Sequence, residues 1–159
     1  MEFLEWVQVL CGLWAIGSGA NVLHGVLKVK LRWNRVVRFL RFSLITSMVG
    51  LLPLSRHFAP IQGICMLSIY CAGTAVLAWR KFYLAGLWRP VFAFFIVCVL
   101  YLNVVSVSIR VFSFAPALAE ASLKSGSLFE MVQILLASVF AVLAVRAVGV
   151  CHAPRTQTL

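Results

Sequence analysis

The sequence contains no aspartate and only four acidic residues, which are Glu2, Glu5, Glu120 and Glu130. Catalytic mechanisms that need two cooperating carboxylates therefore have few candidate residues in this sequence. The motifs G-x-S-x-G, H-E-x-x-H, C-x-x-C and the Walker phosphate loop are absent as well. These absences exclude the usual sequence signatures of hydrolases, metalloproteases and nucleotide-binding enzymes. We expect no catalytic residue, no metal and no cofactor.

Charge of either sign is scarce in this chain. Charged residues make up 11% of the sequence and hydrophobic residues 63%, whereas soluble domains have about 25% and about 45–50%. The mean hydropathy is +1.02. Because a soluble fold of 159 residues cannot cover so much apolar surface, we predict an all-α integral membrane protein. Its net charge of +10 then reflects membrane topology, and no nucleic-acid partner is expected.

Five segments are candidate membrane-spanning helices, each of which needs about 20 apolar residues. Their predicted bounds are 3–27, 36–54, 59–79, 88–109 and 127–148. Together they form one bundle over residues 1–150, followed by a cytoplasmic tail at 151–159. The second segment is the weakest, because only Phe42 to Leu54 is free of charge. The alternative is four spans, with this segment re-entrant or interfacial.

The distribution of basic residues favours five spans. With the N-terminus outside, eleven Lys and Arg residues lie on the cytoplasmic side and three outside, and all four Glu residues lie outside. Four spans allow at best a division of nine to five. The positive-inside rule therefore predicts a multi-pass cell-membrane protein with its C-terminus in the cytoplasm.

A basic cluster dominates the first cytoplasmic loop, in the stretch KVKLRWNRVVRFLR. Its first predicted role is to orient the chain in the membrane. A second is contact with anionic lipid headgroups, which attract each nearby basic residue by about 1 kcal/mol. A specific protein partner is the third. The cluster consists of Lys28, Lys30, Arg32, Arg35, Arg38 and Arg41.

Polar side chains inside the predicted spans are candidate functional residues, because they are costly in hydrocarbon. Asn21 and His24 lie three residues apart and so share one helix face. They could bridge to a neighbouring helix, or form part of a proton or ligand path.

A second polar group belongs to the outer halves of the spans and could line a cavity open to the outside. Glu130 is the leading member, although Ser127 three residues earlier completes a helix-capping pattern that explains it equally well. The group consists of Glu5, Gln8, Arg56, His57, Gln62, Asn103, Arg110, Glu130 and Gln133.

Small residues spaced four apart predict where helices approach closely in a membrane. The pairs are Ala15 with Gly19, Ser43 with Ser47, Ser68 with Ala72, and Ala137 with Ala141. The first and third segments are the richest in small residues. We expect these two to be inner helices in close contact, and the bulkier fourth segment to face lipid over much of its surface.

Residues 65–104 contain the runs AWRKF, LAGLWR and LYLN. In this region the chain resembles small multi-span proteins of bacterial inner membranes to which no activity is assigned. The resemblance implies a bacterial inner membrane and no particular chemistry.

Three functions remain open at this point. The first is a non-catalytic accessory, scaffold or assembly component that forms a homo-oligomer or joins a larger membrane complex. The second is a small oligomeric transporter or channel. The third is a membrane enzyme acting on lipid or quinone.

Overall fold

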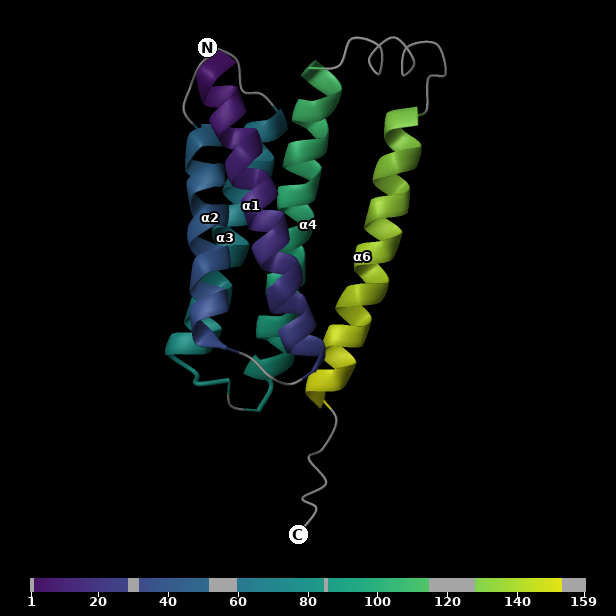
Figure 1. Cartoon of the computed structure of the whole chain (residues 1–159). Coiled ribbons are helices and arrows are strands. Elements are labelled where there is room, and N and C mark those ends of the chain that lie inside the picture. The colour runs from purple at the N-terminus through teal and green to yellow at the C-terminus, as the bar shows by residue number, and fades with distance from the viewer. Residues whose placement is uncertain (1, 29–31, 52–59, 85, 115–127, 153–159) are drawn as a thin grey trace.

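The structure is a computed structural model that describes residues 2–28, 32–51, 60–84, 86–114 and 128–152. This part of the chain is helical and contains no strand, which confirms the predicted all-α class. Neighbouring helices along the chain run in opposite directions (Figure 1). The helices are α1 (Glu2–Leu27), α2 (Trp33–Leu51), α3 (Pro60–Arg80), α4 (Trp88–Phe114) and α6 (Leu128–His152).

The helix bounds follow the predicted segments closely. Pro60 opens α3 and Pro90 lies in the first turn of α4, where a missing backbone N–H costs little. The fourth segment continues past its predicted end at residue 109 to Phe114, and the last helix continues to His152. The predicted end of the second segment, residues 52–54, lies outside the described residues.

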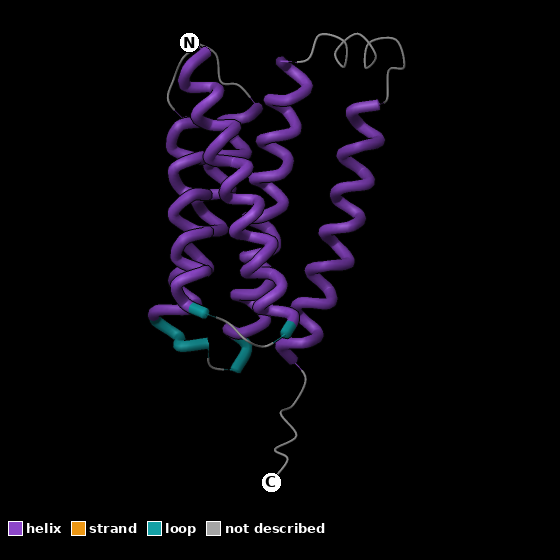
Figure 2. The backbone as a smooth tube through the Cα atoms, in the orientation of Figure 1, coloured by secondary structure: helices purple, strands orange, loops and turns teal. Residues whose placement is uncertain are grey.

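Helices α1 to α4 form a ring, in which each contacts the next and α4 closes on α1. Helix α6 lies outside the ring, against α4 and to a smaller extent α1 (Figures 1 and 2). We call the end where α1 ends and α2 begins the basic end, since Lys28, Arg32, Arg80, Lys81 and Arg89 lie there. The other end, where α1 begins, is the N-terminal end.

Four of the five helices, α1, α3, α4 and α6, are long and apolar enough to cross a membrane. The protein is therefore a multi-pass membrane protein of the helical class. Helix α2 is less apolar, because three arginines occupy its first half and its buried face carries hydroxyl groups. It nevertheless runs alongside α1 and α3 as a continuous helix of 19 residues.

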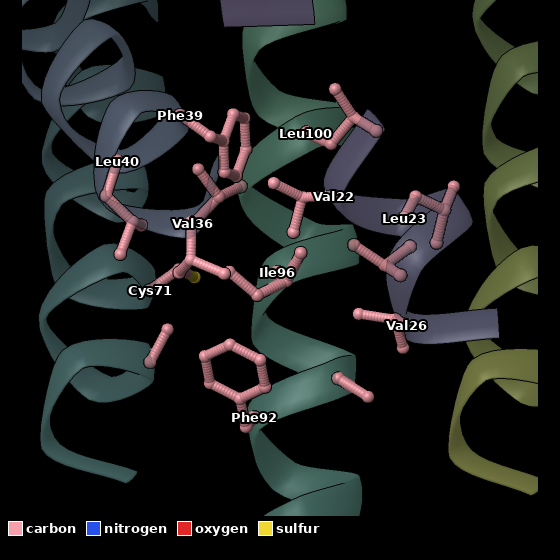
Figure 3. Packing of buried hydrophobic residues seen from close by; sticks show 14 of the residues in the cluster. Val22, Leu23, Val26, Val36, Phe39, Leu40, Cys71, Phe92, Ile96 and Leu100 are labelled. Carbon is pink, nitrogen blue, oxygen red and sulfur yellow. The ribbon is translucent and has the colours of Figure 1, made fainter. Parts of the chain in front are cut away.

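An apolar core fills the half of the ring next to the basic end. All four ring helices contribute to it. Among the side chains that Figure 3 labels are Val22 and Val26 from α1, Phe39 from α2, and Phe92 and Ile96 from α4. Each of these side chains is at most 2% exposed. Burial this complete leaves the ring closely packed here, with no internal passage along these residues.

The packing face of α1 repeats at alternating intervals of four and three residues. This spacing keeps one seam of a helix facing its neighbours. At Gly12 an added Cβ would come within 2.5 Å of Val107 on α4, and at Gly19 within 2.6 Å of Leu100. Glycine at these two positions therefore allows α1 and α4 to approach closely. The seam is formed by Gln8, Gly12, Ala15, Gly19, Val22 and Val26, all buried.

Two packing predictions were wrong. Helices α1 and α3, expected to meet, make no contact within the described residues, because they lie at opposite corners of the ring. The α1 small residues face α4 and α2 instead. Helix α4, expected to face lipid, is the most buried helix: 56% of the residues in its apolar window are buried, against 6% in α6. Its bulky side chains fill the space that the small residues of its neighbours leave open.

Aromatic side chains gather at the basic end. The rings of Trp33 and Trp79 stack with centroids 4.6 Å apart, and Phe82 stacks on Trp88 at 3.7 Å. Amphipathic aromatic rings favour the membrane–water interface. The turn between α3 and α4 is closed by the Leu84 N–H donating to the Ala78 carbonyl at 3.3 Å. These contacts hold the ends of α2, α3 and α4 together where the basic residues lie.

Candidate functional site

The interior of the ring changes from apolar to polar toward the N-terminal end. Every polar side chain that is buried among the described residues lies in this half of the ring, and all four ring helices contribute. We call this set the polar layer. Its members are Gln8 of α1, Ser43, Thr46 and Ser47 of α2, Ser68 of α3, and Asn103 and Ser106 of α4.

Asn103 belongs to the polar layer and is only 2% exposed. Its Nδ2 donates to Ser43 Oγ at 2.7 Å and to the Val99 carbonyl of its own helix at 2.8 Å. The first bond joins α4 to α2 across the ring. The bond to Ser43 favours one rotational setting of both helices, because any other setting would leave one buried N–H of Asn103 without a partner.

A second polar contact joins α1 to α4 nearer the N-terminal end. Arg110 Nη2 donates to Gln8 Oε1 at 2.8 Å, and Gln8 is 3% exposed. The Nε2 of Gln8 is buried and has no hydrogen-bond partner within the described residues. Arg110 lies within the apolar span of α4, Trp88–Phe112, where a cation is costly and by default functional.

Gly50 of α2 closes the layer beside this contact. An added Cβ at this position would come within 2.4 Å of Cys65 Sγ and 2.8 Å of Gln8 Nε2. The close approach of α2 at Gly50 therefore covers the Gln8 amide, which is 3% exposed. An amide and a guanidinium in this setting can bind an anion or orient a neighbouring helix.

The predicted outer polar group is brought together only in part. Gln8, Asn103 and Arg110 converge inside the ring, as described above. Glu130 is exposed in the first turn of α6, and Gln133 is half-buried with its Nε2 buried and unpaired within the described residues. Gln62 is also half-buried. The side chain of Glu5, and Arg56, His57 and Ser127, lie outside what the structure describes.

Asn21 and His24 are both exposed on α1 rather than buried between helices. The Asn21 Nδ2 donates to the Gly17 carbonyl of its own helix at 3.0 Å. The bridge to another helix is therefore not formed by this amide group. Asn21 instead borders a groove between α1 and α2, together with Arg35 and Arg38.

The basic cluster lies along the start of α2 and the end of α1. Lys28, Arg32, Arg38 and Arg41 are exposed and Arg35 is half-buried, whereas Lys30 lies outside the described residues. Within the described residues no three His, Cys or Glu side chains are placed to hold a metal ion. All five cysteines are free.

Sequence reasoning identified Asn103, Gln8 and Arg110 as polar groups at similar depth, but not their partners. The Ser43 hydroxyl reads in the sequence as one of several small residues, and only the packing of α2 on α4 makes it the acceptor for Asn103. No sequence pattern predicted the groove between α1 and α2, because the groove depends on which faces of the two helices lie apart in the folded structure.

No family model, curated protein or solved structure matches this chain. The resemblance to bacterial inner-membrane proteins therefore stays a prediction.

Proposed function

We propose that the protein is a non-catalytic assembly component of a cell membrane, that it crosses the membrane five times, and that it self-associates through α6. One observation carries this proposal. Helices α1 to α4 bury their packing faces against one another, whereas α6 leaves most of its surface uncovered, with 6% of its apolar window buried. A closed ring with one attached outer helix supports a role in assembly better than one in chemistry.

The exposed side of α6 carries small residues as well as large apolar ones. Three of the four small-residue pairs named above lie buried or nearly so in the ring, whereas Ala137 and Ala141 are exposed on α6. Small side chains gain little from lipid but allow a second helix to approach closely. The hydroxyl group of the adjacent Ser138 donates to the Ile134 carbonyl at 2.8 Å. It therefore needs no hydrogen-bond partner on a second helix. A second copy of the same helix is the occupant this surface fits.

Self-association is tested by native mass measurement of the full chain in lipid nanodiscs and by crosslinking in membranes. The wild-type chain should form a dimer. The double variant Ala137→Leu/Ala141→Leu should weaken it about tenfold or more, because steric clashes at a close helix crossing cost roughly 1–3 kcal/mol.

The control is Leu135→Phe/Val139→Phe, which adds bulk to an exposed pair on the other side of α6 and should leave the dimer intact. A wild-type chain that stays monomeric at every protein-to-lipid ratio contradicts the proposal.

A second candidate function is a small oligomeric transporter, which the Gln8–Arg110 contact favours. A half-buried guanidinium within a span suits an anion rather than a cation. If this function holds, anion flux into proteoliposomes should fall about tenfold or more in Arg110→Gln, by loss of an attraction of roughly 1.5–3 kcal/mol. Arg146→Gln, which removes an exposed charge on α6, is the control. Equal flux in wild type and Arg110→Gln eliminates this candidate.

A further inference from the structure

A groove with a volume of about 650 Å³ lies between α1 and α2 on the outside of the ring. This volume is within the range of roughly 300–1,000 Å³ found for small-molecule sites. The groove differs from the polar layer in that it faces outward: Leu13 and Trp14 on its wall are 52% and 67% exposed. Its two ends differ in chemistry.

The end nearer the basic end of the bundle is cationic. Arg35 and Arg38 of α2 face Asn21 of α1 there. The Nε of Arg38 donates to the Asn34 carbonyl at 3.3 Å, which directs the guanidinium along α2 and leaves its two Nη groups for a ligand. None of the described residues that line the groove is acidic. Two guanidinium groups and an amide donor are suited to binding a phosphate group, which guanidinium binds in a bidentate manner.

The other end of the groove is apolar and extends toward the middle of the span. Trp14 of α1 and Phe42 of α2 stack there, with ring centroids 6.1 Å apart, beside Leu13. From Asn21 to Leu13 the groove follows α1 for about 12 Å, at about 1.5 Å per residue. Residue 17, between the two ends, is glycine, and a Cβ there would meet no atom within 4 Å. Nothing in the described structure therefore interrupts the groove between its cationic and apolar ends.

We propose that this groove binds one anionic phospholipid, with the headgroup phosphate at Arg35 and Arg38 and the upper acyl chain against Trp14 and Phe42. The cations lie within about two helical turns of the basic end, at the depth of headgroups for a helix that crosses the bilayer. A free phosphate would use only the cationic end. The apolar end matches the remainder of a lipid, and this continuity decides for lipid.

The test uses the fluorescence of Trp14 in the purified full chain. The contribution of Trp14 to the fluorescence is the part that is lost in Trp14→Phe. Phosphatidylglycerol with brominated acyl chains should quench this contribution more strongly than brominated phosphatidylcholine does. Arg35→Gln/Arg38→Gln should reduce the preference for phosphatidylglycerol about tenfold or more, the combined effect of two basic residues near a membrane surface.

The matched control removes the same charge from the same cluster outside the groove. Arg32→Gln/Arg41→Gln should keep the preference, because neither residue lines the groove. If both double variants lose it equally, general charge attraction explains the binding and the site does not exist. If millimolar inorganic phosphate displaces the brominated lipid, the occupant is a free anion and the lipid proposal is wrong.

A second pair of variants tests the groove without changing charge. Gly17→Leu places a side chain in the open groove and should abolish the Trp14-specific quenching. Gly73→Leu, at an exposed position of α3 where a Cβ also meets nothing within 4 Å, should leave it unchanged. Undiminished quenching in Gly17→Leu would overturn the proposal even if the arginine variants fail to fold.

Discussion

At the scale of single residues, Asn103 illustrates how a polar group becomes structural in a membrane. Its amide bonds to Ser43 and to the Val99 carbonyl use both of its N–H groups. Hydrogen bonds between membrane helices contribute only about 0.6 kcal/mol on average. The value of this one lies in specificity, because a rotated α4 would keep the Val99 bond of its own helix but lose the Ser43 bond, and one buried N–H would be left without a partner.

Glycine makes a testable contribution at the same scale. Gly19→Ala should lower the free energy of unfolding by roughly 1–3 kcal/mol, since its Cβ would come within 2.6 Å of Leu100 and 2.7 Å of Phe39. Unfolding in mixed detergent micelles measures this change.

Gly17→Ala is the internal control for that experiment. Gly17 lies two residues away on the same helix, and an added Cβ there would meet no atom within 4 Å. The higher helix propensity of alanine should therefore leave the protein equally stable or more stable. Equal losses in the two variants would mean that the α1–α4 approach is not set by Gly19.

At the scale of elements, α2 is the helix on which the number of crossings depends. It is too polar to qualify as a span by hydropathy alone. Its hydroxyl groups face the ring, however: Ser43 binds Asn103, and Thr46 Oγ1 donates to the Phe42 carbonyl at 2.9 Å. Arg38 and Arg41 lie on its exposed side and can extend along the helix toward headgroups. Hydropathy thus undervalues a helix whose polar groups are paired inside the bundle.

The proposed five crossings predict that the two termini lie on opposite sides of the membrane. An N-terminal cysteine tag should react with an impermeant maleimide in intact cells, and a C-terminal tag only after permeabilisation. The reason is the cation distribution: all described Lys and Arg residues except Arg41 and Arg110 lie at or near the basic end, which the positive-inside rule places in the cytoplasm.

The terminal tags need a control for access to the reagent, and the native cysteines should first be changed to serine or alanine. A tag at residue 82, in the turn at the basic end, should behave like the C-terminal tag. Two termini that react on the same side would contradict five crossings and leave α2 as an interfacial helix.

At the scale of the whole molecule, the protein is a ring with an interior of two halves and one outer helix. The apolar half packs Phe39, Phe92 and Ile96 around the α1 seam. The polar half holds the Asn103 and Arg110 contacts. The ring helices also expose apolar side chains, but α6 is the least covered of the candidate spans, with 6% of its apolar window buried. The assembly proposal therefore centres on α6.

The sequence by itself determined the membrane setting, the all-α class and the positions of the helices to within a few residues. These properties depend on composition and on the spacing of nearby residues, so each segment can be interpreted without knowing what it contacts. The small-residue pairs on α1, α2 and α3 were also readable as packing positions, although their partners were not.

Only the tertiary structure decided which helices meet. The diagonal placement of α1 and α3, the central position of α4 and the pairing of Asn103 with Ser43 each depend on how bulky and small faces complement one another across the ring. Periodicity shows that a face is suited to packing but carries no information about its partner, because every apolar helix in lipid offers similar surfaces.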